Sequence, residues 1–160
     1  MTTSIGKEDF TTADAVVKEL IDAGVEVVFG VVSIHNLPIY DAIAREGSIH
    51  LVKARGESGA VNMADAYARA TGKLGVVITS TGTGAGNGAG ALIEAWSAGS
   101  PVLHITGEVA SPYLGLGKNF IHECKDQLSM MEASCKKAYL LRVPDQAIPM
   151  IRKSIQEALT

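Results

Sequence analysis

The stretch LVKARGESGAVNMADAYARATGKLGVVITSTGTGAGNGAG, residues 51–90, decides the fold. It predicts a short buried strand over 51–54, a helix over 58–71 and a second strand over 76–79, followed by a glycine-rich turn. Small and apolar residues recur at helical spacing in 58–71, and Gly72 supplies the left-handed residue that commonly ends a helix. A strand, a helix and a strand in succession indicate parallel pairing with a right-handed crossover.

One acid stands out in this stretch. Glu57 lies between Gly56 and Ser58, where the first predicted strand is followed by the helix. Ligands of open parallel sheets bind at the carboxyl ends of the strands, so this position favours a functional role. The alternative is that Glu57 only complements the positive end of the helix dipole.

Strands and helices alternate along the rest of the chain. The patterns predict helices over 11–23, 37–45, 86–98, 126–133 and 144–159, strands over 25–29, 101–106 and 138–143, and loops over 30–36 and 108–124. This alternation predicts the α/β class, a three-layer α/β/α sandwich around a parallel sheet. The 160 residues are expected to form a single domain.

Composition excludes several classes of protein. Hydrophobic residues make up 47% and charged residues 19%, as in a globular protein and not a disordered one. The net charge of -3 comes without a basic stripe, so no nucleic-acid partner is expected. No apolar run reaches the roughly 20 residues that span a bilayer, so no membrane segment is expected.

Two further features predict a cytoplasmic location. Residues 1–10, MTTSIGKEDF, lack the apolar core of a signal peptide. Cys124 and Cys135 form neither a CxxC pair nor part of a metal-spaced set, and we expect free thiols in a reducing compartment.

The glycine-rich turn, TGTGAGNGAG over 81–90, differs from the two familiar phosphate loops. It has no strict G-x-G-x-x-G, only a looser form ending in alanine at Gly84, Gly86 and Ala89. The acid expected about 20 residues later in a dinucleotide site is poorly matched by Glu108, which follows another strand. The glycines either permit tight helix–sheet packing or let the backbone pass close beside a flat heterocycle.

The blocks taken together resemble a known family. GAVNMADAYARATGK after Glu57, then GVVITSTGTGAGN and SPVLHITG, extending back to FGVVSIHNLPIYDAI, resemble the N-terminal, pyrimidine-binding domain of thiamine-diphosphate-dependent enzymes. They are most similar to the acetolactate synthase and benzoylformate decarboxylase group. The resemblance implies a six-stranded parallel sheet whose last strand would follow the helix ending at Thr160, so the domain is expected to be truncated before that strand.

The resemblance also implies roles for residues near the cofactor. Glu57 would be the catalytic acid that hydrogen-bonds N1′ of the aminopyrimidine and favours the imino tautomer, whose 4′ nitrogen takes the C2 proton. This requires a carboxyl group within hydrogen-bond reach of the ring in a site poor in water. The cofactor-binding candidates are Thr81, Gly82, Thr83, Gly84 and Asn87. Thr83 stands where relatives usually have proline, and Asn87 has the alternative role of a helix cap.

Four residues are candidates on the substrate side: Ser33, His35, His122 and Glu123. Val32 and Ser33 replace the proline-glycine pair of related enzymes, and His122-Glu123 matches a block that reads glutamine-glutamate in acetolactate synthases. His35 is either an acid–base group or an ordinary loop histidine. His122 is a candidate for handling protons in decarboxylation or product release.

The resemblance implies that the metal lies elsewhere. Relatives bind magnesium and the diphosphate through a Gly-Asp-Gly block and paired asparagines in a second domain, and these 160 residues contain no such block. We therefore expect only the pyrimidine end of thiamine diphosphate here, no metal ligands, and a diphosphate-binding domain from another subunit or chain as partner. The small-residue faces of 58–69 and 86–98 would contact it, in a homodimer or tetramer.

Three functions remain open at this point. The first is a fragment of an enzyme that decarboxylates or ligates 2-keto acids, an acetolactate synthase-like lyase or transferase, inactive without its other domain. The second is the small subunit of a split thiamine-dependent decarboxylase. The third is a non-catalytic module that kept the fold. Glu57 argues against the third, and an end before an expected strand favours the first over the second.

Overall fold

A computed structural model describes residues 10–160; the first nine residues, most of the stretch that lacks a signal-peptide core, lie outside this range. The described residues form one parallel sheet in the order β2-β1-β3-β4. Its strands are β1 (Val27–Gly30), β2 (His50–Lys53), β3 (Gly75–Thr79) and β4 (Val102–Thr106). β1 pairs with β2 and β3, and β3 pairs with β4.

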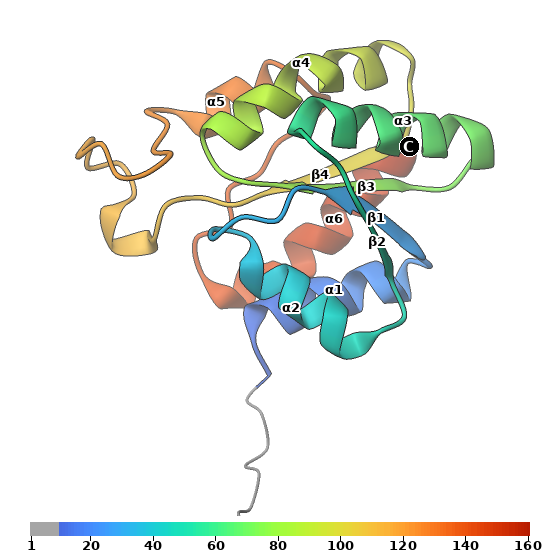
Figure 1. Cartoon of the computed structure of the whole chain (residues 1–160), viewed down its shortest axis with the longest axis horizontal. Coiled ribbons are helices and arrows are strands. Elements are labelled where there is room, and N and C mark those ends of the chain that lie inside the picture. Colours follow the sequence, from blue (N-terminus) through green and yellow to red (C-terminus); the bar gives the residue numbers. More distant parts are fainter. Residues whose placement is uncertain (1–9) are drawn as a thin grey trace, which may run out of the picture.

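Helices cover both faces of the sheet (Figure 1). One face carries α1 (Thr12–Asp22), α2 (Leu37–Glu46) and α6 (Ala147–Leu159), and the other carries α3 (Glu57–Thr71), α4 (Thr83–Ser97) and the short α5 (Gln127–Glu132). Each face has its own apolar core, one built around Leu20, Val76 and Ile78 and the other around Val61, Val77 and Leu92. The predicted three-layer α/β/α sandwich around a parallel sheet is confirmed. Among residues 10–160 no helix is long and apolar enough to cross a membrane.

The element order is also confirmed for most of the chain. All four observed strands overlap predicted ones, and Gly72 ends α3 with φ +70°. The resemblance implied six strands, and four are formed within residues 10–160. A 3-10 turn at Pro144–Gln146 precedes α6, so the last helix begins three residues later than predicted.

The fifth strand predicted over 138–143 is wrong. Residues 138–143 lie in irregular backbone, and a cavity of about 450 Å³ is lined by residues 102–108 on the β4 side and by residues 135–141 on the other. The run AYLLRV has the composition of a strand, but a strand also needs a hydrogen-bonded neighbour. In the described residues β4 pairs only with β3, so residues 138–143 have no hydrogen-bonded strand partner.

The glycine-rich turn is shorter than predicted, because α4 begins at Thr83 and not at residue 86. Gly82 makes the turn in a single residue with φ +53°. A Cβ placed on Gly88 would lie 3.3 Å from Val61 Cγ2 and 3.2 Å from His104 Cε1, so this glycine lets α4 lie close to α3 and to the sheet. The packing alternative for these glycines therefore holds at Gly88.

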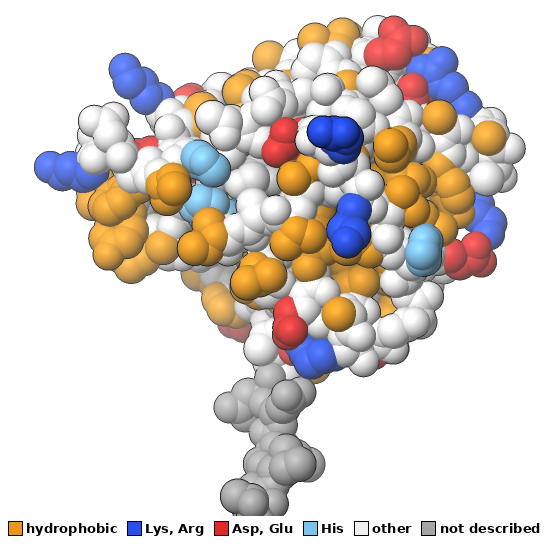
Figure 2. All heavy atoms as spheres, in the orientation of Figure 1, with side chains coloured by type: hydrophobic (Ala, Val, Ile, Leu, Met, Phe, Trp, Pro, Cys, Tyr) orange, Lys and Arg blue, Asp and Glu red, His pale blue; other side chains and the backbone are white. Residues whose placement is uncertain are grey.

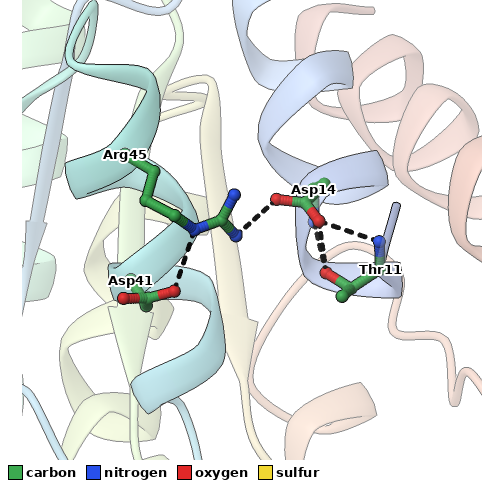
Figure 3. A network of polar contacts seen from close by, with 4 residues as sticks. All are labelled: Thr11, Asp14, Asp41 and Arg45. Atoms are coloured by element: carbon green, nitrogen blue, oxygen red, sulfur yellow. Dashed lines mark hydrogen bonds and ion pairs between the residues drawn. The ribbon is translucent and has the colours of Figure 1, made fainter. Parts of the chain in front are cut away.

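A polar network joins α1 to α2 at the opposite face (Figure 3). Thr11 caps α1 in a capping box, with its backbone N–H donating to Asp14 Oδ2 at 2.8 Å. Arg45 Nη2 donates to Asp14 Oδ1 at 2.6 Å and Arg45 Nε to Asp41 Oδ2 at 3.0 Å. The hydrogen bonds from Thr11, followed by that from Arg45, lower the pKa of Asp14 to about 2.

Candidate functional site

Glu57 is the first residue of α3. The helix therefore begins one residue earlier than the predicted range of 58–71. Its side chain is half-buried, and Asn87 Nδ2 donates to Glu57 Oε2 at 3.2 Å. Oε1 accepts no hydrogen bond from residues 10–160, and it is not sealed from solvent. One carboxylate oxygen is therefore fixed by the protein, and the other is free to meet a ligand.

Gly84 lies directly against this carboxylate. A Cβ on Gly84 would be 2.7 Å from Ser80 Cβ and 3.2 Å from Glu57 Oε1. A side chain on Gly84 would clash with Ser80 and crowd Glu57, so glycine lets the first turn of α4 lie close to both. The structure thus brings together Glu57, Gly84 and Asn87, which are up to 30 residues apart in sequence. The alternative that Asn87 caps a helix is wrong, because Asn87 lies inside α4 and Gly82 is the N-cap.

A buried glutamine organises the turn between β3 and α4. Gln127 Oε1 accepts from the backbone N–H of Gly82 and from Thr81 Oγ1 at 2.9 Å, and Gln127 Nε2 donates to the Gly107 carbonyl at 2.8 Å. Thr81 is fully buried. Its hydroxyl is therefore engaged within the protein, whereas Thr83 is exposed at the start of α4.

Gln127 and Gly107 are the parts of this region that sequence reasoning missed. Gln127 is the first residue of α5, and the cap of that helix is Asp126, whose Oδ1 accepts from Ser129 N at 3.0 Å. Gly107 is packed so closely on the 31–36 loop that a Cβ there would lie 2.9 Å from His35 Cβ. Neither role carries a local signal, because each depends on contacts between distant segments.

The loop after β1 is held in shape by one buried amide. Asn36 is fully buried, accepts from Ser33 N at 2.7 Å and donates to the Val31 carbonyl at 3.0 Å. The Ser33 hydroxyl and His35 Nδ1 are buried and have no hydrogen-bond partner within residues 10–160. Two of the substrate-side candidates thus lie in a loop with unused polar atoms.

The other two candidates lie in the long loop after β4. The His122 ring lies 5.6 Å from the His35 ring, measured between centroids. Glu123 stabilises its own loop, because its two oxygens accept from Gly117 N and Phe120 N, each at 3.0 Å. A Cβ on Gly82 would be 1.9 Å from the His122 carbonyl oxygen, so this loop also covers the turn.

His104 lies in β4 with its ring turned into the protein. Its Nε2 lies 2.7 Å from Thr79 Oγ1, and its Nδ1 is buried without a partner in the described part of the chain. Part of the residue surface borders the cavity beside β4, yet burial of the ring lowers the pKa of His104 to about 4. Within residues 10–160 no group of three His, Cys, Asp or Glu side chains is placed to hold a metal ion.

The chemistry of the site suits a flat, nitrogen-containing ring. Glu57 Oε1 offers a hydrogen-bond acceptor, or a donor when protonated, and the backbone at Gly84 leaves no side chain beside it. The pyrimidine of thiamine diphosphate has ring nitrogens that pair with a carboxyl group. The residues present therefore fit the pyrimidine end of that cofactor.

Comparison with known proteins points to the same group. A family described as "Thiamine pyrophosphate enzyme, N-terminal TPP binding domain" matches residues 10–130. An acetolactate synthase large subunit of Haemophilus influenzae is 36% identical over 148 residues, which is 92% of this chain and 25% of the relative. The acetolactate synthase isozyme 3 large subunit of Escherichia coli is 35% identical over 147 residues, again 92% of this chain and 25% of the relative.

A third relative has a different name. A Pseudomonas aeruginosa protein named "Probable 2-ketoarginine decarboxylase" is 34% identical over 148 residues, 92% of this chain and 26% of the relative. The chain thus spans about a quarter of the length of the curated relatives it matches. With a family match over three quarters of its length, the chain belongs to the thiamine pyrophosphate enzymes, where it corresponds to the N-terminal TPP-binding domain.

Proposed function

We propose that this chain is the pyrimidine-binding domain of a thiamine-diphosphate-dependent enzyme that decarboxylates or ligates 2-keto acids, and that Glu57 activates the cofactor. The observation that carries the proposal is the carboxylate of Glu57, with Oε2 held by Asn87 and Oε1 free beside Gly84. The family match and the names of the relatives support the reaction class.

Thiamine diphosphate supplies an electron sink for bond cleavage next to a keto group. Glu57 would exchange a proton or a hydrogen bond with N1′ of the pyrimidine through Oε1, while Asn87 keeps the carboxyl group in one orientation. The buried Gln127 amide fixes the turn at Thr81 and Gly82, so the backbone beside the ring does not have to be ordered on binding.

The diphosphate and Mg²⁺ would be bound by another domain. The outer faces of α3 and α4 are its proposed contact surface, because Met63, Ile93 and Trp96 are exposed there. Apolar side chains grouped on one surface favour contact with another protein surface. Without that domain the chain would be inactive, and with it we propose a cytoplasmic homo-oligomer.

Two arrangements supply such a domain. It is either part of the same longer polypeptide or a separate chain that pairs with this one as a small subunit. Relatives about four times as long favour the first arrangement. A non-catalytic module is a third arrangement, and the Glu57–Asn87 contact speaks against it.

The test is turnover of pyruvate and benzoylformate by the full-length or reconstituted protein, with and without thiamine diphosphate and Mg²⁺. We expect Glu57→Gln to lose activity by about a hundredfold or more, since the amide cannot move a proton. Glu46→Gln is the matched control, because Glu46 is exposed at the end of α2 on the opposite face. Equal activity of wild type and Glu57→Gln would refute the role of Glu57. Cofactor binding without turnover of any keto acid would favour the non-catalytic module.

A further inference from the structure

Gln127 is a buried amide that joins three segments of the chain. It is the first residue of α5, and only 7% of its surface is exposed. Its Oε1 accepts from Gly82 N and Thr81 Oγ1 at the turn between β3 and α4. Its Nε2 donates to the Gly107 carbonyl just after β4. The turn is therefore ordered by a side chain that lies far from it in sequence.

The backbone permits only one orientation of this amide. The side-chain oxygen faces the Gly82 N–H, and the NH₂ group faces the Gly107 carbonyl oxygen. A flipped amide would set donor against donor at Gly82 and acceptor against acceptor at Gly107. The position therefore requires one acceptor and one donor at the end of a side chain of this length. Glutamine supplies both, and glutamate supplies both only when it is protonated.

The turn that Gln127 holds leads directly to the candidate acid. Gly82, the N-cap of α4, has no side chain to cap the helix, and Gln127 instead accepts from its N–H. Gly84 N donates to the Thr81 carbonyl at 3.1 Å, and a Cβ on Gly84 would lie 3.2 Å from Glu57 Oε1. The position of Gly84 beside Glu57 thus depends on a turn that Gln127 fixes.

Thr81 belongs to the same network. Its hydroxyl is fully buried, donates to Gln127 Oε1 at 2.9 Å and lies 3.3 Å from Glu108 Oε1. A hydroxyl has one proton, and two oxygens of the protein already compete for it. The network therefore favours a role of Thr81 through the turn over direct contact of its hydroxyl with a ligand.

We propose that Gln127 is a positioning residue for thiamine diphosphate, and that it acts with Thr81 on the backbone of residues 82–84. The proposal rests on the function proposed above, in which this chain binds the pyrimidine end of that cofactor. Gln127 holds Gly84 beside Glu57 before the cofactor arrives, so binding does not have to order the turn. Loss of the amide therefore weakens cofactor binding.

The first experiment measures the binding of thiamine diphosphate and Mg²⁺ to the full-length or reconstituted protein by calorimetry at about pH 7.5. Gln127→Met keeps the length of the side chain without its acceptor and donor, and should weaken binding about tenfold or more. Gln146→Met is the matched control. Gln146 Oε1 also accepts from two backbone N–H groups, those of Arg142 and Val143, but it precedes α6 on the other face of the sheet. Unchanged affinity in Gln127→Met, or an equal loss in Gln146→Met, would overturn the proposal.

The second experiment uses pH to separate positioning from a loss of structure. Gln127→Glu keeps the acceptor at Oε1, and its second oxygen faces the Gly107 carbonyl, to which it can donate only as the neutral acid. Because burial favours the neutral acid, the affinity of this variant relative to wild type should rise several-fold from about pH 7.5 to about pH 5.5. Gln146→Glu should show no such rise. A ratio that stays constant with pH would contradict the proposal, as would recovery of thermal stability without recovery of affinity.

The affinities are compared at equal pH because other titratable groups lie near both ends of the amide. The backbone of His122 packs on Gly82, and that of His35 packs on Gly107. Their rings are 5.6 Å apart between centroids, and Figure 2 shows histidine side chains gathered on one face of the molecule beside apolar side chains. Glu108 is the acid that shares the buried threonine hydroxyl. These groups are the same in wild type and variant, so the ratio of affinities reports the change at position 127.

A double-mutant cycle tests the role of Thr81. Thr81→Val removes the hydroxyl at nearly constant shape and should weaken binding about threefold to tenfold in the wild-type background. In the Gln127→Met background it should have little further effect, because the two residues act through one network. Equal losses in both backgrounds would show that the hydroxyl acts independently, and would refute the shared role.

Glu57→Gln in the same assays separates the two proposals. Normal turnover of Glu57→Gln together with weak cofactor binding by Gln127→Met would refute the proposed role of Glu57 and support positioning by Gln127. Loss of turnover in Glu57→Gln together with normal cofactor binding by Gln127→Met would refute the positioning role alone.

Discussion

The α3–α4 face of the sheet and the outer edge of β4 differ in how closely the neighbouring segments approach the strands. On the α3–α4 side, a Cβ on Gly75 would lie 2.2 Å from the Ala64 carbonyl, and one on Gly84 would lie 2.7 Å from Ser80 Cβ. On the outer side of β4, a cavity of about 450 Å³ lies between the strand and residues 135–141. Glycines make the first side tight, and the second side has no strand to close it. The candidate site is built on the tight side.

The largest expected effect is the loss of the turn between β3 and α4. Gly82→Ala should destabilise the protein by about 3–5 kcal/mol, because its Cβ would be 1.9 Å from the His122 carbonyl at a residue with φ +53°. Gly99→Ala is the matched control, since Gly99 has φ +65° but no atom within 4 Å of a Cβ. It should cost only about 1–2 kcal/mol. Urea unfolding measures both, and equal losses would show that the contact with His122 is not rigid.

A smaller effect compares added volume on the two sides. Ala64→Leu should cost about 1–3 kcal/mol, because Ala64 is fully buried where α3 touches β3. Ala158→Leu should raise stability by about 0.5–1 kcal/mol, since Ala158 lines the cavity beside β4. Thermal unfolding of the two variants is the measurement. A destabilising Ala158→Leu would mean that the cavity side has no room for a side chain.

The smallest expected effect is a difference in acid sensitivity. Burial lowers the pKa of His104 to about 4 in the folded protein, whereas its pKa in the unfolded chain is near 6.5. As the pH drops from 6.5 toward 4, the unfolded chain binds a proton at His104 that the folded protein does not, so the stability falls. The expected loss between pH 6.5 and 5.5 is about 1 kcal/mol. Asp14, whose pKa is lowered to about 2, loses its contribution only as pH falls from 3.8 toward 2. Urea unfolding of His104→Gln between pH 7 and 4.5 should give a flatter pH profile than wild type, whereas Asp14→Asn should change the profile only below pH 4.

The same comparison explains which parts of the fold could be predicted. The ends of β3 and α3 are marked within their own sequences, by the limits of an apolar run in β3 and by Gly72 after α3. The bounds of both elements were predicted within a residue or two. Residues 138–143 have an equally apolar pattern, but whether they form a strand depends on a neighbour outside the segment. A local pattern contains no information about that neighbour.

The candidate site was predictable only in part, for a similar reason. The positions of Glu57, Gly84 and Asn87 follow from a strand–helix order, so their meeting at one sheet edge could be anticipated. The hydrogen bond between Thr81 and Gln127 could not be anticipated, because the two residues are 46 positions apart and no sequence motif links them. The roles of these residues toward a cofactor stay predictions until the variants are measured.

The hydrogen bonds of buried Gln127 make the turn at residues 81–82 depend on how long α5 stays docked. This residue belongs to α5, a helix of six residues that is too short to persist alone, and its bonds close a loop of 46 residues. We therefore expect the opening of α5 to be among the earliest local unfolding events. The turn at residues 81–82 stays assembled only while α5 is docked. The lifetime of the site is then set by the residence time of one short helix, which hydrogen exchange at the Gly82 amide would report.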